Sequence, residues 1–191
     1  MPLPASVART EMHKRTIEMR GYRRDDGLFD IEGRVVDTKA DVLHRLGGGV
    51  TPANTPIHDM WIRLTVDDDL TVRDIVAVTD STPFVVCREA VAPMAVIVGE
   101  RIRPGWSNLV KSKLGGAAGC THLMELLLPL ATTAFQTLHP VRVKKMQQED
   151  PARPPSKLDS CYAYAANREV VATMWPAFYT GQEKVTGIRH D

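Results

Sequence analysis

A thiol and an imidazole lie two residues apart where a glycine-rich stretch passes into an apolar one. Cys120 and His122 follow Gly119, and from Leu123 the apolar residues recur at the three- and four-residue spacing of a helix. Cys120 is therefore expected at a helix N-terminus, where unpaired N–H groups and the helix dipole favour a thiolate. Such a thiolate is a nucleophile or a metal ligand, with His122 as a base or a second ligand. A small buried cysteine beside a capping histidine explains the same residues equally well.

Two strands joined by a tight turn are predicted in the middle of the chain. Polar and apolar residues alternate over residues 57–66, three aspartates at 67–69 form a turn, and valines mark a second strand over residues 72–78. In an antiparallel hairpin the start of one strand lies beside the end of the next. We therefore expect one end of the sheet to gather His58, Asp59 and Asp80.

Further carboxylates are candidate acids and bases. A half-buried strand is predicted over residues 29–35, with Asp30 and Glu32 on the same face. Paired carboxylates of this kind bind metals or transfer protons, although the solvated side of an outer strand is the favoured alternative. Glu125 lies three residues after His122 and shares its helix face, so it is a further candidate base.

The pattern as a whole predicts an α+β fold, in which a small antiparallel sheet packs on helices. Residues 1–20 are expected to form a loose arm or a first helix. Residues 84–114 are expected to be helical, with Ser107 capping a short second helix. A long helix, kinked at Pro129, is expected to run to about Leu138.

The C-terminal part of the chain changes in composition. Prolines and charges over residues 140–157 indicate a linker. Residues 158–191 are expected to add a β-hairpin extension and an aromatic plug. We predict a single domain over residues 1–191, with its core at about 21–139.

Composition and charge exclude several classes of protein. The 191 residues carry a net charge of +1 with 25% charged residues, which gives no reason to expect a nucleic-acid partner. The three cysteines form no closely spaced pair, which argues against a disulfide framework and a four-cysteine zinc site. No apolar run reaches the length of a membrane span. We expect a cytoplasmic protein that acts on a small-molecule substrate and can form a homo-oligomer.

Four sequence blocks together resemble an uncharacterised bacterial family, a domain of unknown function. These blocks are residues 21–33, 57–82, 119–136 and 175–181. The resemblance covers most of the chain but implies no activity.

The order of elements over residues 57–138 resembles a second family, the iron–sulfur scaffold family of IscU, SufU and NifU N-terminal domains. In that family the metal ligands come from before the first hairpin strand, after the second strand and from the start of the last helix. The resemblance implies an IscU-like core whose ligands are His58, Asp59, Asp80, Cys120 and His122. Two of the three scaffold cysteines are absent, which disfavours a cluster and favours one zinc or iron ion.

An enzyme of the lyase or hydrolase type is the favoured function by a small margin. One divalent metal with an open coordination position would polarise a carbonyl or activate water, and Glu125 or the pair Asp30 and Glu32 would supply a base. A small anionic or carbonyl substrate would be held by Arg23, Arg24, Arg63 and Trp61.

Other functions fit the same residues. A metal-free enzyme would use Cys120 as the nucleophile and His58 or His122 as the base. A non-catalytic accessory protein would bind a metal or a cluster without turning over a small molecule. In a third interpretation Cys120 and His122 only cap and pack a helix.

Overall fold

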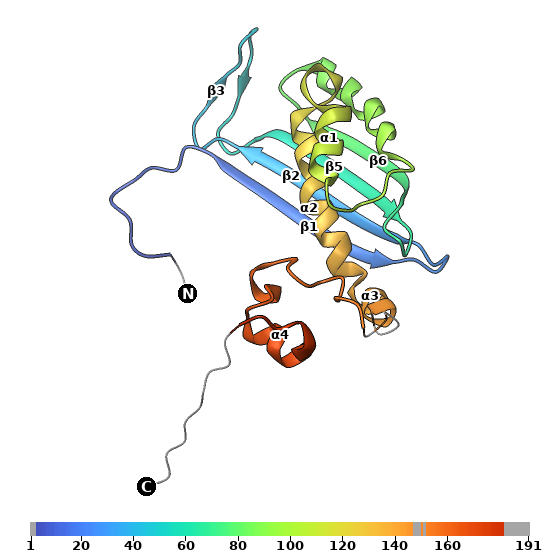
Figure 1. Cartoon of the computed structure of the whole chain (residues 1–191). Helices are drawn as coiled ribbons and strands as arrows, with labels where there is room; N and C mark the ends of the chain where they lie inside the picture. The colour runs from blue at the N-terminus through green and yellow to red at the C-terminus, as the bar shows by residue number, and fades with distance from the viewer. Residues whose placement is uncertain (1–2, 147–149, 151, 182–191) are drawn as a thin grey trace. The chain divides into compact units, whose positions relative to one another are not determined.

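The computed structural model describes residues 3–146, 150 and 152–181. The chain divides into two compact units, residues 1–139 and residues 140–191. The first unit holds the sheet and the helices that pack on it, and the second unit holds short helices (Figure 1).

The first unit is built on a four-stranded antiparallel sheet with the strand order β1-β2-β5-β6, so each strand pairs with the next long strand of the chain. Its strands are β1 (Lys14–Arg23), β2 (Phe29–Thr38), β5 (Pro56–Val66) and β6 (Val72–Ser81). Between β2 and β5 the chain forms a small two-stranded arm that projects from the sheet (Figure 1). The arm contains β3 (Leu43–His44) and β4 (Val50–Thr51).

The alternation of side chains along each strand gives the sheet an apolar inner face and a polar outer face. On β2, Ile31, Gly33 and Val35 are buried while Glu32 and Arg34 are half-buried. On β5, Ile62 and Leu64 are buried while Arg63 is exposed. The inner face meets the helices, and the same alternation decides which polar side chains at the strand ends face inward.

Helices cover the inner face of the sheet (Figure 1). The 3₁₀ helix η1 (Val85–Ile97) and the helix α2 (Thr121–Thr137) contact the strands. The helix α1 (Trp106–Leu114) packs on η1 and α2, and the 3₁₀ helix η2 (Gly116–Ala118) packs on α1. The helix α2 buries an apolar stripe that contacts β1, β2 and β5. The indole of Trp106 on α1 donates a hydrogen bond to the Leu127 carbonyl of α2, at 3.0 Å between Nε1 and O.

The second unit contains helices where a linker and a hairpin were expected. The helix α3 (His139–Met146) begins at the boundary of the units, and it is followed by η3 (Tyr162–Tyr164), α4 (Glu169–Met174) and η4 (Pro176–Phe178). The predicted C-terminal β-hairpin is therefore wrong within residues 158–181. Residues 147–149, 151 and 182–191 of the predicted linker and extension lie outside the described residues.

Aromatic contacts explain why the C-terminal segment does not form a hairpin. The rings of Tyr164 and Trp175 pack at 5.5 Å between centroids, and the guanidinium of Arg168 lies 4.0 Å above the Tyr162 ring. The contact between Tyr164 and Trp175 joins the segments before and after α4. These aromatic rings therefore pack on each other rather than on a partner strand.

Two local predictions in the first unit also need correction. Residues 14–20 belong to the edge strand β1 rather than to a loose arm or a helix. Nearly every residue of β1 is exposed, so the strand lacks the alternation by which the others are recognised. The helix α1 is preceded by Gly105 with a positive φ of 93°, so Ser107 lies inside the helix and does not cap it.

No helix within the described residues is long and apolar enough to cross a membrane.

Candidate functional site

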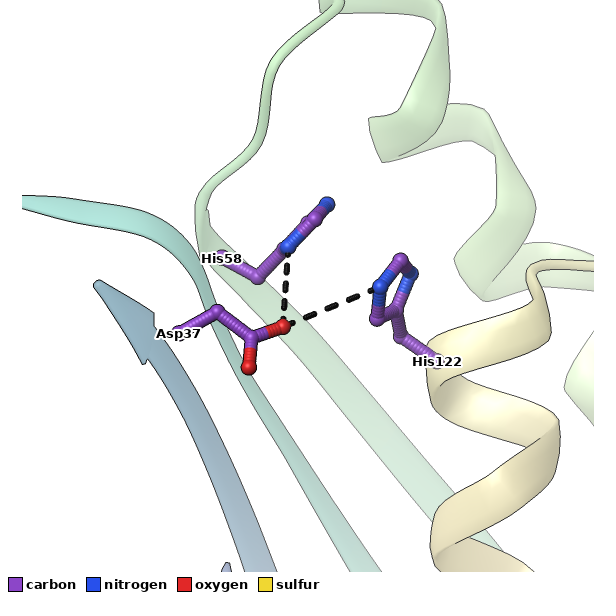
Figure 2. Close-up of side chains that lie close together, drawn as sticks. All are labelled: Asp37, His58 and His122. Atoms are coloured by element: carbon purple, nitrogen blue, oxygen red, sulfur yellow. Dashed lines mark hydrogen bonds and ion pairs between the residues drawn. The ribbon is translucent and has the colours of Figure 1, made fainter. Parts of the chain in front are cut away.

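Three polar side chains meet where the inner face of the sheet reaches the start of α2. Asp37, near the end of β2, lies on the same face as Val35 and pairs in register with His58 of β5. His58 in turn lies on the same face as the buried Met60. His122 occupies the first turn of α2. Figure 2 shows both histidine rings directed at the Asp37 carboxylate from β5 and α2.

The distances within this cluster are short. His58 Nδ1 lies 3.1 Å from Asp37 Oδ2, and His122 Nε2 lies 3.8 Å from the same oxygen. The two imidazole rings are 3.8 Å apart between centroids and inclined by 30°. One ligand atom from each of the three residues lies within 4.8 Å of the others, so the group could hold a metal ion.

Further residues around the cluster hold the Asp37 carboxylate in place. Arg15 of β1 forms a bidentate pair with it, with Nε 2.8 Å from Oδ1 and Nη2 2.9 Å from Oδ2. His13 Nε2 lies 3.2 Å from Oδ1. Arg15 also donates to Glu125 Oε2 of α2 at 3.1 Å, so one guanidinium connects β1, β2 and α2.

The surroundings favour an ionised Asp37. Its residue surface is only 1% exposed, and burial by itself would raise the pKa of the carboxyl. The hydrogen bonds and charge of Arg15, with the nearby His58 and His13, outweigh burial and hold the pKa of Asp37 below its ordinary value.

The surroundings of the two histidines favour their neutral form. Burial lowers the pKa of His58, against the opposing attraction of Asp37. Burial also lowers the pKa of His122, and the neighbouring His58 and Arg15 add to the shift. An ionised carboxylate and two neutral imidazoles are the protonation states that metal coordination requires.

Cys120 lies on the far side of His122 from Asp37. It is the residue that precedes α2, as expected, and its Sγ lies 3.9 Å from His122 Nδ1. Thiol, imidazole and carboxylate therefore form a row from Cys120 through His122 to Asp37. Within the described part of the chain the thiol is not one of the three clustered ligands.

Asp59 and Asp80, two of the predicted metal ligands, lie at the expected end of the sheet but outside the cluster. Asp59 is one residue from His58, so the alternation of the strand turns it to the outer face. There its carboxylate pairs with Arg34 at 2.8 Å and 2.6 Å. Asp80 lies with Trp61 and Arg63 along an outer-face pocket. Of the five predicted ligands, His58 and His122 belong to the group with Asp37 that the described residues form, while Asp59, Asp80 and Cys120 lie outside it.

The predicted bases Asp30 and Glu32 also lie away from the cluster. Asp30 is at the opposite end of β2 from Asp37, where it accepts a hydrogen bond from Thr65 Oγ1 at 2.7 Å. Glu32 pairs with Arg63 on the outer face, at 3.3 Å between Oε1 and Nε. Glu125 is the one predicted base that reaches the cluster, through Arg15.

The predicted substrate-binding residues do not surround the cluster. Arg23 ends β1, at the opposite end of that strand from Arg15. Arg24 follows it and pairs with Asp26 and, more loosely, with Asp30. The predicted pair Trp61 and Arg63 lies on the outer face.

The sequence analysis missed one member of the cluster, Asp37, and its two neighbours Arg15 and His13. Asp37 lies two residues beyond the last apolar residue of the predicted strand, so extending the alternation by one step would have placed it on the inner face. The same rule separates His58 from Asp59. Arg15 and His13 carried no comparable signal, because β1 has no clear alternation.

The comparisons with known proteins concern the first unit. A family model described as "Protein of unknown function (DUF2889)" matches residues 13–136. The match begins at His13 and includes every residue of the cluster described above. No curated protein and no solved structure matches the chain, so the resemblance to the iron–sulfur scaffolds finds no support there. The matched segment spans well over half of the chain, and the protein therefore belongs to the DUF2889 family.

Proposed function

We propose that this protein is a metal-dependent enzyme, of the lyase or hydrolase type, that acts on a small anionic or carbonyl substrate. One divalent ion, zinc or iron, would be held by Asp37, His58 and His122. The observation that supports this proposal is the convergence of one buried carboxylate and two half-buried imidazoles, whose ligand atoms lie within 4.8 Å of one another.

The donor set suits such an ion. Two imidazoles and one carboxylate bind catalytic zinc in several enzymes and iron(II) in others, and both kinds of site keep a position open for substrate. Ligands about 2.1 Å from a tetrahedral ion lie about 3.4 Å from one another. The observed separations of 3.1 Å and 3.8 Å from Asp37 Oδ2 are close to that value, so small side-chain adjustments would suffice.

The surrounding residues have the positions that catalysis would need. Arg15 fixes the carboxylate of Asp37 from behind, as outer partners of metal ligands commonly do. His13 and Glu125 contact this network from partly exposed positions and are candidates to move protons between solvent and the site. A bound ion would polarise a carbonyl or lower the pKa of water.

A thiol-dependent enzyme is the second candidate, and the row from Cys120 through His122 to Asp37 favours it. In this alternative His122 would deprotonate the thiol, and Asp37 would orient the imidazole. The atoms are farther apart than in a formed hydrogen bond, as is common for catalytic groups without substrate. A non-catalytic metal-binding accessory protein is the remaining alternative. It would hold the ion but show no turnover.

The first experiment measures metal binding by the purified full-length chain. Zinc and cobalt(II) are titrated into metal-free wild type and into Asp37→Asn, His58→Gln and His122→Gln variants, with His44→Gln as the matched control on the exposed arm. We expect one ion per chain in wild type and His44→Gln, and at least a hundredfold weaker binding in the other three variants. Equal binding by wild type and His58→Gln would contradict the proposed site.

Cobalt also reports on the thiol. If Cys120 were a fourth ligand, its sulfur would give an intense charge-transfer band that disappears in Cys120→Ser. We expect the band to be absent and Cys120→Ser to bind cobalt as wild type does. A Cys120→Ser variant that keeps its metal but loses all activity found in the wild type would favour the thiol enzyme.

A further inference from the structure

A pocket lies at the base of the arm. It has a volume of about 270 Å³. Its walls come from the arm, from the start of β5, from the end of β6 and from the start of η1. The residues that line it are Arg45, Thr51, Pro52, Thr55, Pro56, Ile57, Asp80, Ser81, Thr82, Pro83 and Arg88.

Along the chain, the walls of this pocket adjoin the strand ends that carry the cluster, while Asp37, His58 and His122 themselves do not line it. The arm leaves the sheet just after Asp37 and returns to it just before His58. Pro56 and Ile57 line the pocket and are the two residues that precede His58. Ser81, on the opposite wall, pairs with Asp59 in register. A molecule in the pocket would therefore lie within one or two residues of His58 along the strand.

The charge of the pocket is basic. Arg45 and Arg88 line it with one acid, Asp80. Within the described part of the chain neither guanidinium forms an ion pair. Arg45 is nevertheless oriented, because its Nε donates to the buried Thr51 hydroxyl at 2.8 Å, which leaves its terminal N–H groups available. Hydroxyls of Ser81 and Thr55 add further hydrogen-bonding groups to the walls.

We propose that this pocket binds an oxoanion group of the substrate, a carboxylate or a phosphate, with Arg45 and Arg88 as the anion-binding residues. Guanidinium groups match both kinds of oxoanion with paired hydrogen bonds. The pocket, of about 270 Å³, has room for such a group together with a short part of the molecule that carries it. This inference rests on the proposed function, since it adds the substrate class to the same site.

The pocket on the outer face of the sheet does not suit an anion. It is lined by Glu32, Arg63 and Asp80 among apolar residues. Its arginine is already paired with Glu32 at 3.3 Å. The outer pocket thus has an excess of negative charge, whereas the pocket at the arm has an excess of positive charge.

The test is anion binding to the full-length protein, measured by calorimetry with inorganic phosphate and separately with acetate. Metal-free and zinc-loaded forms are compared, because an anion can also bind to a metal. The variants are Arg45→Gln, Arg88→Gln and the double variant, with Arg63→Gln as a control arginine outside the pocket. Asp80→Asn removes the one negative charge that lines the pocket, so it should strengthen anion binding where the arginine variants weaken it.

We expect at least one of the two anions to bind metal-free wild type, and the anion that binds identifies the group as phosphate or carboxylate. The double variant should weaken binding at least tenfold, Arg63→Gln should leave it unchanged and Asp80→Asn should strengthen it severalfold. No binding of either anion at millimolar concentration, or binding that the double variant does not change, would overturn the inference.

The same measurements separate this inference from the metal site. Anion binding that requires zinc and His58 but not the two arginines would reject the pocket and leave the metal site standing. Anion binding that requires the arginines in a protein that takes up no metal would support the pocket and reject the metal-dependent function.

Discussion

Asp37 is a buried carboxylate whose neighbours all favour its charged form. Arg15 holds both oxygens, and three histidines lie within ion-pair distance. A buried charge is costly unless it is paired and hydrogen-bonded. The arrangement therefore stores a negative charge beside two neutral imidazoles, where a divalent cation would find a complementary site.

Replacing Arg15 should reveal how strongly this carboxylate depends on its partner. Arg15→Gln leaves the buried Asp37 with fewer charged donors, so we expect the free energy of unfolding to fall by about 1–3 kcal/mol. Zinc affinity should also fall, by about 10–100-fold, because the ligand loses the residue that orients it. Urea unfolding and zinc titration measure the two effects.

Arg24→Gln is the matched control for that variant. It breaks an exposed ion pair with Asp26 near the other end of the same strand, which should leave both the free energy of unfolding and zinc binding nearly unchanged. Equal effects of the two substitutions would show that Asp37 does not depend on Arg15.

The lowered pKa values of His58 and His122 make the metal-free protein sensitive to acid. In the unfolded chain a histidine takes up a proton near its ordinary pKa of about 6.5, whereas the folded protein resists protonation. The unfolded state therefore binds more protons below that pH, and the free energy of unfolding should fall from about pH 7 to pH 5.

His122→Gln tests the source of that slope. Because this variant lacks a histidine that resists protonation in the folded protein, the free energy of unfolding should depend less steeply on pH. His44→Gln on the arm should leave that dependence unchanged. Urea unfolding curves at three pH values would measure this. A slope that is the same in wild type and His122→Gln would place the acid sensitivity elsewhere.

At the scale of elements, the contact between β1 and α2 decides where Arg15 sits. The two elements approach closely at Gly21, where any Cβ would overlap the hydroxyl of Thr137. Gly33, on the neighbouring strand, faces the flexible end of Met19 and, at 3.1 Å, the Cδ2 of the buried Leu130. Gly21 thus permits the edge strand to lie under α2 over its whole length.

Gly21→Ala should accordingly destabilise the protein more than Gly33→Ala. The added methyl group at position 21 meets a side chain fixed on a helix, and we expect a loss of about 1–3 kcal/mol, while the thioether at the second site can move aside. Thermal unfolding of the two variants gives the comparison. If Gly33→Ala proved the more damaging, β1 would not be held against α2 at this point.

The elements that could be predicted are those that bury one face and expose the other. Strands β2, β5 and β6 and the helix α2 each alternate or repeat with a clear period, because one face meets the core. The strand β1 and the short helices of the second unit lack such a period. Their conformation depends on tertiary contacts, such as the pairing of β1 with β2 and the stacking of Tyr164 on Trp175.

The candidate site was predicted in part for the same reason. His58, Cys120 and His122 follow from the hairpin and the helix start. Side chains alternate between the two faces of a strand, so the position of Asp59 on the face opposite His58 and outside the cluster could have been predicted. The bidentate contact of Arg15 with Asp37 depends on the register of β1, which the sequence does not reveal.

At the scale of the whole molecule, the site belongs entirely to the first unit. Every residue from His13 to Glu125 in the network lies within residues 1–139, and the family match ends at residue 136. We therefore expect a fragment of residues 1–139 to unfold cooperatively and to bind zinc with the affinity of the full chain. A fragment that is insoluble or binds no zinc would show that the second unit is required.

The arm formed by β3 and β4 joins β2, which carries Asp37, to β5, which carries His58. The arm itself contributes no residue to the metal-ligand cluster. Its length and sequence can therefore change without altering Asp37 or His58, although they would alter the walls of the anion pocket. Under the proposed function, the metal ligands and one wall of the substrate pocket would therefore lie in separate stretches of the chain. Exchanging residues 39–55 between family members would be a way to redirect the chemistry to a new substrate by a single graft.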